Sequence, residues 1–129
     1  MILVDTSVIV AWLDRNHPHH RASLAAIEHW AQRDQLAVSC VTCGELAAGG
    51  RTRAAVEEDL RHFEKIPLDT DAAWRAGMAF RQYRRKDTDD PVLPDFLIRA
   101  QAAVLNLRHL TNDRRRIRSF SDVDFEFVN

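Results

Sequence analysis

The sequence predicts an α/β fold in which helices flank a central, mostly parallel sheet of five strands, a three-layer sandwich. Short apolar segments alternate along the 129 residues with longer segments whose apolar side chains recur at helical spacing, which is typical of this class. The first segment, residues 2–4, is apolar at every position and suits a strand buried on both faces of a parallel sheet. A chain of this length builds one core, so we expect a single domain over residues 1–129.

Five segments are predicted as strands. Pro67 has no N–H to give to a sheet ladder, which indicates that its strand lies at an edge. Near the C-terminus, Val123, Phe125 and Phe127 alternate with acids, the pattern of a strand covered on one face only. The predicted strands cover residues 2–4, 36–39, 66–68, 109–111 and 123–127.

Six segments are predicted as helices. In the one over 71–85, helical spacing places Trp74, Met78 and Phe80 toward the core. Pro94 suits the first position of the last helix, because it lacks an N–H that the helix would not use there. That last helix is apolar nearly all round, which predicts that it is buried. The predicted helices cover residues 6–13, 21–33, a short segment from about 43, 52–65, 71–85 and 94–105.

The net charge of −1 neither indicates nor excludes a nucleic-acid partner, but the arginines are clustered. Arg114, Arg115 and Arg116 carry planar groups that suit RNA phosphates; solvated cations at a helix end are the alternative. Two cysteines, Cys40 and Cys43, indicate a reducing compartment, although a C-x-x-C pair could also serve redox or zinc chemistry. The chain shows no signal peptide and no apolar run of the ~20 residues that a membrane span needs, so we expect a cytoplasmic protein.

Four acids from distant parts of the sequence are expected at one edge of the sheet. Asp5 and Asp113 each follow a predicted strand, and Glu45 comes shortly after another. Asp95 lies in the first turn of the buried helix. In open parallel sheets, ligands bind outside the carboxyl ends of the strands, so these four side chains can converge there.

Convergence of carboxylates points to a bound cation. Two carboxylates ~4 Å apart repel by about 4 kcal/mol at an effective dielectric near 20, so either their pKa values rise or a cation neutralises them. Oxygen ligands favour Mg²⁺, with Mn²⁺ as a substitute, over zinc. Such an ion could bind a phosphodiester, activate a water and stabilise the leaving oxygen. The pattern therefore predicts metal-assisted phosphodiester hydrolysis.

Each acid could also have a purely structural role. Asp5 could cap the first helix, and Glu45 stands at capping-box spacing after Thr42. Asp95 in a first helical turn is favoured by the helix dipole, and Asp113 could begin an Asx-turn. Only the joint arrangement of the four favours a functional site.

Four segments in order resemble the PIN-domain nucleases, in particular the small VapC-type toxins of type II toxin–antitoxin systems. The segments are Ile2–Ser7, Thr42–Leu46 with Gly49, Leu93–Ile98, and Leu110–Asp113. The resemblance spans essentially the whole chain and implies a PIN-like five-stranded sheet and a divalent-metal site at Asp5, Glu45, Asp95 and Asp113. It further implies an endoribonuclease that hydrolyses RNA, forms a homodimer, and is held inactive by a small antitoxin covering the site.

The resemblance also implies supporting polar residues around the acids. Thr6, Ser7, Thr111 and Asn112 match positions that usually support the carboxylates through hydrogen bonds or held waters. Some relatives carry a further acid shortly after the last aspartate. Arginines stand at that place here, so the number of metal ions is left open.

Other functions remain as alternatives. A PIN nuclease could process RNA without any antitoxin, or a PIN fold could bind RNA without cutting it. A haloacid-dehalogenase-like phosphatase also begins with an aspartate after an apolar strand, but that family has a second acid where Ser7 stands and a lysine that the stretch 104–113 lacks. His17, His19 and His20 lie at a polar helix start and are interpreted as a solvated face.

Overall fold

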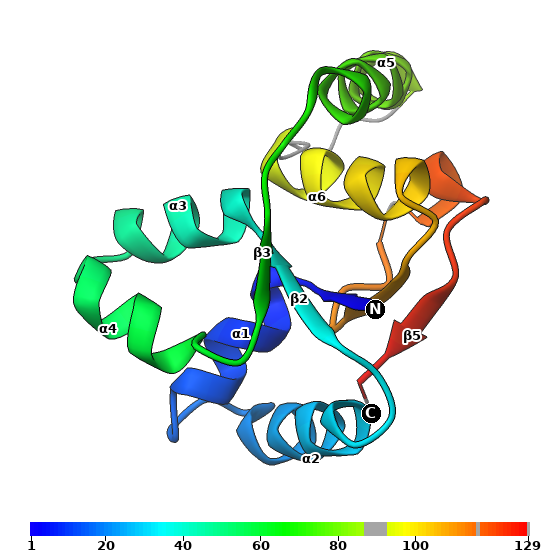
Figure 1. Ribbon diagram of the computed structural model, residues 1–129. Helices are drawn as coiled ribbons and strands as arrows, with labels where there is room; N and C mark the ends of the chain where they lie inside the picture. The colour runs from blue at the N-terminus through cyan, green and yellow to red at the C-terminus, as the bar shows by residue number, and fades with distance from the viewer. Residues whose placement is uncertain (87–92, 116, 129) are drawn as a thin grey trace.

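A five-stranded parallel sheet forms the centre of the molecule, in a computed structural model that describes residues 1–86, 93–115 and 117–128 (Figure 1). Most of the loop predicted over 86–91 lies outside these residues, as does Arg116. The strand order is β3-β2-β1-β4-β5, and every neighbouring pair is parallel. The predicted fold class is therefore confirmed. The strands are β1 (Ile2–Val4), β2 (Leu36–Ser39), β3 (Glu64–Ile66), β4 (Arg108–Thr111) and β5 (Phe125–Phe127).

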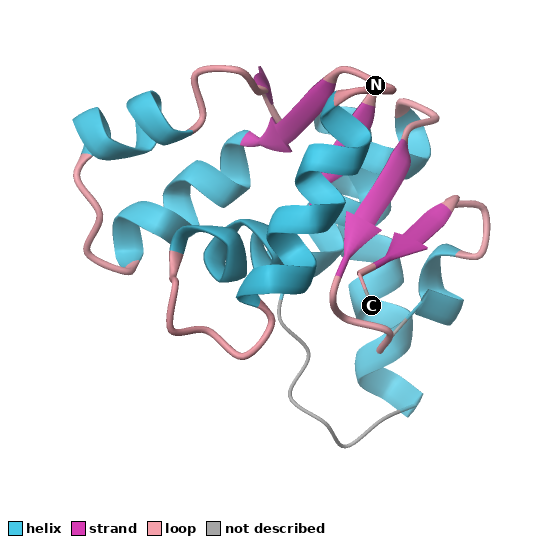
Figure 2. Ribbon diagram, turned by 90° about the horizontal axis from the view of Figure 1, so that it is seen from below, coloured by secondary structure: helices cyan, strands magenta, loops and turns pink. Residues whose placement is uncertain are grey.

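Helices cover both faces of the sheet (Figures 1 and 2). Side chains alternate along β1, so Ile2 and Val4 pack on one face with α1 to α4, while Leu3 packs on the other with α5, α6 and η1. No helix in the described part of the chain has the length and apolar character needed to span a membrane. The helices are α1 (Thr6–Leu13), α2 (His20–Ala31), α3 (Cys40–Ala48), α4 (Arg53–Asp59), α5 (Thr70–Lys86), α6 (Leu93–Val104) and the 3₁₀ helix η1 (Ile117–Phe120).

The segment predicted as one helix over 52–65 is shorter than expected. The Thr52 hydroxyl accepts the N–H of Ala55 and caps α4, but the helix ends at Asp59. The buried side chains of Leu60 and Phe63 then anchor a turn that leads into β3. The strand predicted over 66–68 lies two residues earlier and ends before Pro67, but its predicted position at an edge of the sheet is confirmed.

The prediction for the inward face of α5 is wrong in part. Trp74 is 73% exposed and Met78 is exposed as well. The face that packs against α6 carries the small buried residues Ala72 and Ala76, with Phe80 edge-on to Phe96 at 5.5 Å between ring centroids. Two apolar stripes compete on this helix, and the one with small side chains lets the two helices approach closely.

This arrangement predicts a large effect of one truncation and a small effect of another. Phe96→Ala should lower the free energy of unfolding by roughly 3–5 kcal/mol, because it empties a fully buried site between α5, α6 and η1. Trp74→Ala should change the free energy of unfolding by less than about 1 kcal/mol, because the largely exposed ring buries little apolar surface. Urea denaturation of both variants measures this; equal losses would show that Trp74 packs in the core.

Candidate functional site

The four acids predicted from the sequence line a single cavity. Its volume is about 500 Å³, and it lies beyond the carboxyl ends of β1 and β4, where the chain runs to β2 on one side and to β5 on the other. The structure thus brings Asp5, Glu45, Asp95 and Asp113 to one place. The other lining residues are Thr6, Ser7, Val10, His17, His19, Asn112 and Arg115.

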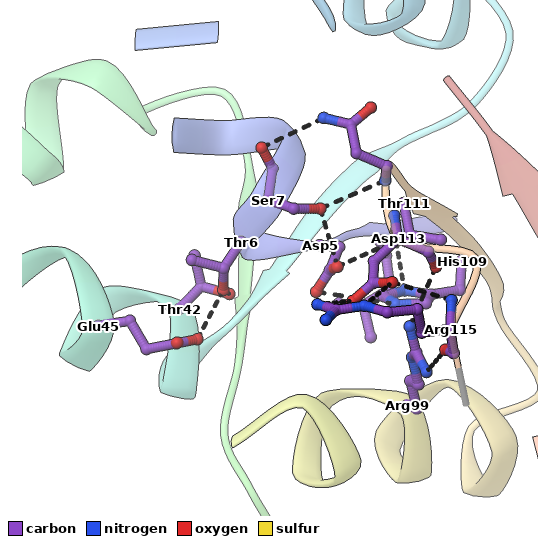
Figure 3. A network of polar contacts seen from close by, with 12 residues as sticks. Asp5, Thr6, Ser7, Thr42, Glu45, Arg99, His109, Thr111, Asp113 and Arg115 are labelled. Atoms are coloured by element: carbon purple, nitrogen blue, oxygen red, sulfur yellow. Dashed lines mark hydrogen bonds and ion pairs between the residues drawn. The ribbon is translucent and has the colours of Figure 1, made fainter. Parts of the chain in front are cut away.

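Asp5 forms the floor of this cavity and is only 5% exposed. It stands at the N-cap position of α1, but its carboxylate makes no capping hydrogen bond, so a capping role does not account for it. Instead its Oδ2 accepts hydrogen bonds from the hydroxyls of Ser7 (3.0 Å) and Thr111 (2.7 Å) (Figure 3). Two neighbouring segments therefore hold one oxygen of Asp5 and fix the orientation of the other.

Glu45 reaches the cavity from α3, on the side of Asp5 that is opposite Asp113 (Figure 3). Helix α3 is capped by Ser39, so the capping box predicted with Thr42 does not form. The Thr6 hydroxyl donates to Oε1 of Glu45 at 2.8 Å, and its oxygen lies 2.8 Å from that of Thr42. Burial raises the pKa of Glu45, and the nearby charge of Asp5 raises it further, while the bond from Thr6 opposes both.

Asp113 is held by its own loop. Its N–H donates to the Thr111 hydroxyl at 3.0 Å, and its Oδ1 accepts the N–H of Arg115 at 2.9 Å, as an Asx-turn does. The Arg115 guanidinium also donates through Nε to Oδ1 and through Nη2 to Oδ2, both at 3.0 Å. Burial alone would raise the pKa of Asp113, but the hydrogen bonds and charge of Arg115 outweigh it and lower this pKa.

Helix α6 contributes Asp95 to the cavity and is hydrogen-bonded to the loop that carries Asp113. Asp95 lies half-buried in the first turn. One turn later, Arg99 is 2% exposed, and its guanidinium donates to the backbone carbonyls of Arg115 (2.7 Å) and Asp113 (3.2 Å). Arg99 was not predicted to have a role, because its helix is apolar nearly all round in the sequence. Its partners are backbone carbonyls, which no side-chain pattern reveals.

His109 lies directly behind Asp5 and was not predicted to matter. Its Nδ1 pairs with the Leu3 carbonyl at 3.0 Å, and its Nε2 lies 3.9 Å from Asp5 Oδ1 without a hydrogen-bond partner among the described residues. Burial lowers the pKa of this imidazole, and the charge of Arg99 lowers it further, although Asp5 opposes. A histidine in a strand predicted to lie inside the sheet is the sequence signal that could have identified it.

The remaining predicted residues have separate places. Asn112 donates its N–H to the Ser7 hydroxyl and its amide to the Ser7 carbonyl, both at 3.3 Å, so it joins β4 to α1. The Arg114 guanidinium lies over the Phe127 ring at 4.1 Å. His17 and His19, expected on a solvated face, line the cavity from the loop between α1 and α2, with ring centroids 5.6 Å apart.

The donor set fits a hard divalent cation, because the four candidate ligands are all carboxylates. In the arrangement described, however, no three Asp, Glu, His or Cys side chains of residues 1–86, 93–115 and 117–128 lie close enough together to share one metal ion. The Arg115 guanidinium also donates to both oxygens of Asp113. A cation therefore requires side-chain rearrangement within the cavity.

The chain belongs to the PIN domain family, whose sequence model matches residues 2–126. No curated protein sequence matches it significantly. Its fold is similar to that of VapBC2 from Rickettsia felis bound to a promoter DNA fragment (TM-score 0.76, 19% identity, 100% of both chains). It is also similar to a toxin–antitoxin complex from Klebsiella pneumoniae (0.72, 24%, 95% of both chains). A third similar structure is VapC20 of Mycobacterium tuberculosis, a sarcin–ricin loop cleaving toxin (0.59, 20%, 84% of this chain and 85% of that one).

The raised pKa of Glu45 predicts a pH-dependent effect of Glu45→Gln in chelator. The parent loses stability relative to the variant as pH rises from the unfolded value near 4.3 through the higher folded pKa, because only the parent then carries a half-buried charge beside Asp5. At pH 7 the variant should melt roughly 1–3 °C higher, and near pH 4 no higher. Melting curves against pH test this, with Glu28→Gln at an exposed position of α2 as the control. A difference in melting temperature that does not change with pH would contradict the raised pKa of Glu45.

Proposed function

We propose that the chain is a Mg²⁺- or Mn²⁺-dependent endoribonuclease that acts as the toxin of a toxin–antitoxin pair. One observation carries the proposal: four carboxylates from four distant segments line one cavity at the carboxyl edge of a PIN-domain sheet. A silent binding protein gains nothing from placing repelling charges together. The phosphatase alternative is set aside, because the chain belongs to the PIN family and has Ser7 where the second acid is needed.

Asp5, Asp95 and Asp113 are the proposed metal ligands, with Glu45 completing the set. The ion would supply Lewis acidity toward the scissile phosphate and lower the pKa of a water. Ser7 and Thr111 both hold one oxygen of Asp5, which limits the rotation of its carboxylate. With Oε1 of Glu45 bonded to Thr6, its Oε2 is the oxygen available to contact the ion.

RNA is the proposed substrate, and the arginines after Asp113 are its proposed phosphate contacts. Arg115 lines the cavity, and Arg114 is exposed beside it. A guanidinium near a cut phosphodiester can donate two parallel hydrogen bonds to its oxygens. His17 and His19 lie at the same cavity and offer aromatic surfaces for an unstacked base.

A small antitoxin is the proposed partner. A second hollow, of about 330 Å³, adjoins the acid cavity and shares Val10 and Glu45 with it. Its walls include the apolar side chains of Leu13 and Leu46 and the cation Arg51. An amphipathic helix lying here could place a basic side chain among the carboxylates. Two of the similar structures are named as VapBC or toxin–antitoxin complexes, which supports this assignment. The homodimer that the family resemblance implies stays a prediction.

The nuclease proposal predicts that the protein cuts defined RNAs at discrete sites in Mn²⁺ or Mg²⁺ and loses this activity in chelator. Asp5→Asn should lower the rate by at least roughly 100-fold, because it removes a ligand charge at the centre of the site. Asp71→Asn, in the exposed first turn of α5, is the matched control and should cut like the parent. Equal cutting by the parent and Asp5→Asn would mean that the activity belongs to a contaminant.

A further inference from the structure

We propose that Arg115 is a positioning residue that occupies Asp113 in the metal-free protein and releases it when a divalent cation binds. The inference rests on the proposed function and deepens it, since it assigns a competitor for the cation within the chain itself. Arg99 is the fixed counterpart that keeps the loop backbone in place while the Arg115 side chain moves.

The contacts of Arg115 show the competition directly. Its Nε and Nη2 each lie 3.0 Å from a different oxygen of Asp113, so a single guanidinium uses both oxygens that a metal ion would need (Figure 3). Paired, charge-assisted bonds of this kind are among the stronger side-chain hydrogen bonds. A cation that binds both oxygens of Asp113 must therefore displace the guanidinium, and a cation that binds one oxygen meets the positive charge of Arg115 beside it.

The Arg115 guanidinium can leave Asp113 without disturbing the backbone of the loop. The Arg115 side chain is 70% exposed, whereas that of Asp113 is 19% exposed. The backbone stays anchored, because the buried Arg99 holds the carbonyls of both Asp113 and Arg115, and the Arg115 N–H holds Asp113 Oδ1. Release of Asp113 therefore involves rotation of a largely exposed side chain and leaves these backbone contacts in place.

The charges favour exchange rather than a permanent bond. A divalent ion brings twice the charge of a guanidinium and can contact several of the cavity's carboxylates at once. Once displaced, Arg115 remains beside the cavity, within reach of a phosphate bound there.

Calorimetric titration with Mn²⁺ tests the inference. Arg115→Gln should bind Mn²⁺ roughly tenfold more tightly than the parent, because the guanidinium no longer competes. Arg118→Gln removes the same charge from the exposed part of η1 and should bind like the parent at physiological ionic strength, where distant charges are screened. Arg115→Lys keeps the charge but loses the paired donors, so its Mn²⁺ affinity should fall between those of the parent and Arg115→Gln.

A second readout does not depend on any variant folding. In the parent, the Nε–H resonance of Arg115 should be shielded from solvent exchange without metal and should lose that protection on titration with Mg²⁺. Equal Mn²⁺ affinity of parent, Arg115→Gln and Arg118→Gln, or an unchanged resonance at saturating Mg²⁺, would overturn the inference while leaving the nuclease proposal intact. No Mn²⁺ binding by the parent, or undiminished binding by Asp5→Asn, would instead overturn the metal site itself, and the inference with it.

Discussion

Repulsion among the carboxylates beyond one edge of the sheet is the constraint on which the rest of the site depends. The repulsion acts on Glu45, whose pKa is raised first by burial and then by the nearby charge of Asp5. Each of three acids has its own donors: Ser7 and Thr111 for Asp5, the Thr6 hydroxyl for Glu45, and a guanidinium for Asp113. The local hydrogen bonds of the cavity thus hold like charges close together.

The fold determines where those donors come from. Strand β1 lies between β2 and β4, so Asp5 at its end meets Thr111 at the end of β4. Helix α1 then starts directly after Asp5 and brings Thr6 and Ser7 to the same place. Behind the acids, buried Arg99 links α6 to the loop after β4, so the segments carrying Asp95 and Asp113 move together. The packing of the strands and helices therefore determines the geometry of the site.

The sequence was sufficient for the parallel sheet and for the convergence of the acids, but it placed the third strand two residues too late. An apolar run that ends in a carboxylate, such as residues 2–5, is typical of a buried parallel strand that leads to the ligand-binding edge of an α/β sheet. The sequence failed where two patterns compete or where the partner is backbone. On α5, Trp74 and Met78 have helical spacing as good as that of Ala72 and Ala76, and only the close packing with α6 decides between them. The role of Arg99 depends on carbonyls fourteen and sixteen residues away, which no side-chain pattern encodes.

The most direct test is an anomalous-scattering map from crystals of the protein soaked in Mn²⁺. The account predicts a peak in contact with carboxylate oxygens of Asp5 and Asp113, together with Asp95, and the Arg115 guanidinium turned away from Asp113. A peak in contact only with His17 and His19 would contradict a carboxylate metal centre at this edge of the sheet. The absence of any peak at saturating Mn²⁺, in crystals whose cavity is open to solvent, would contradict it as well.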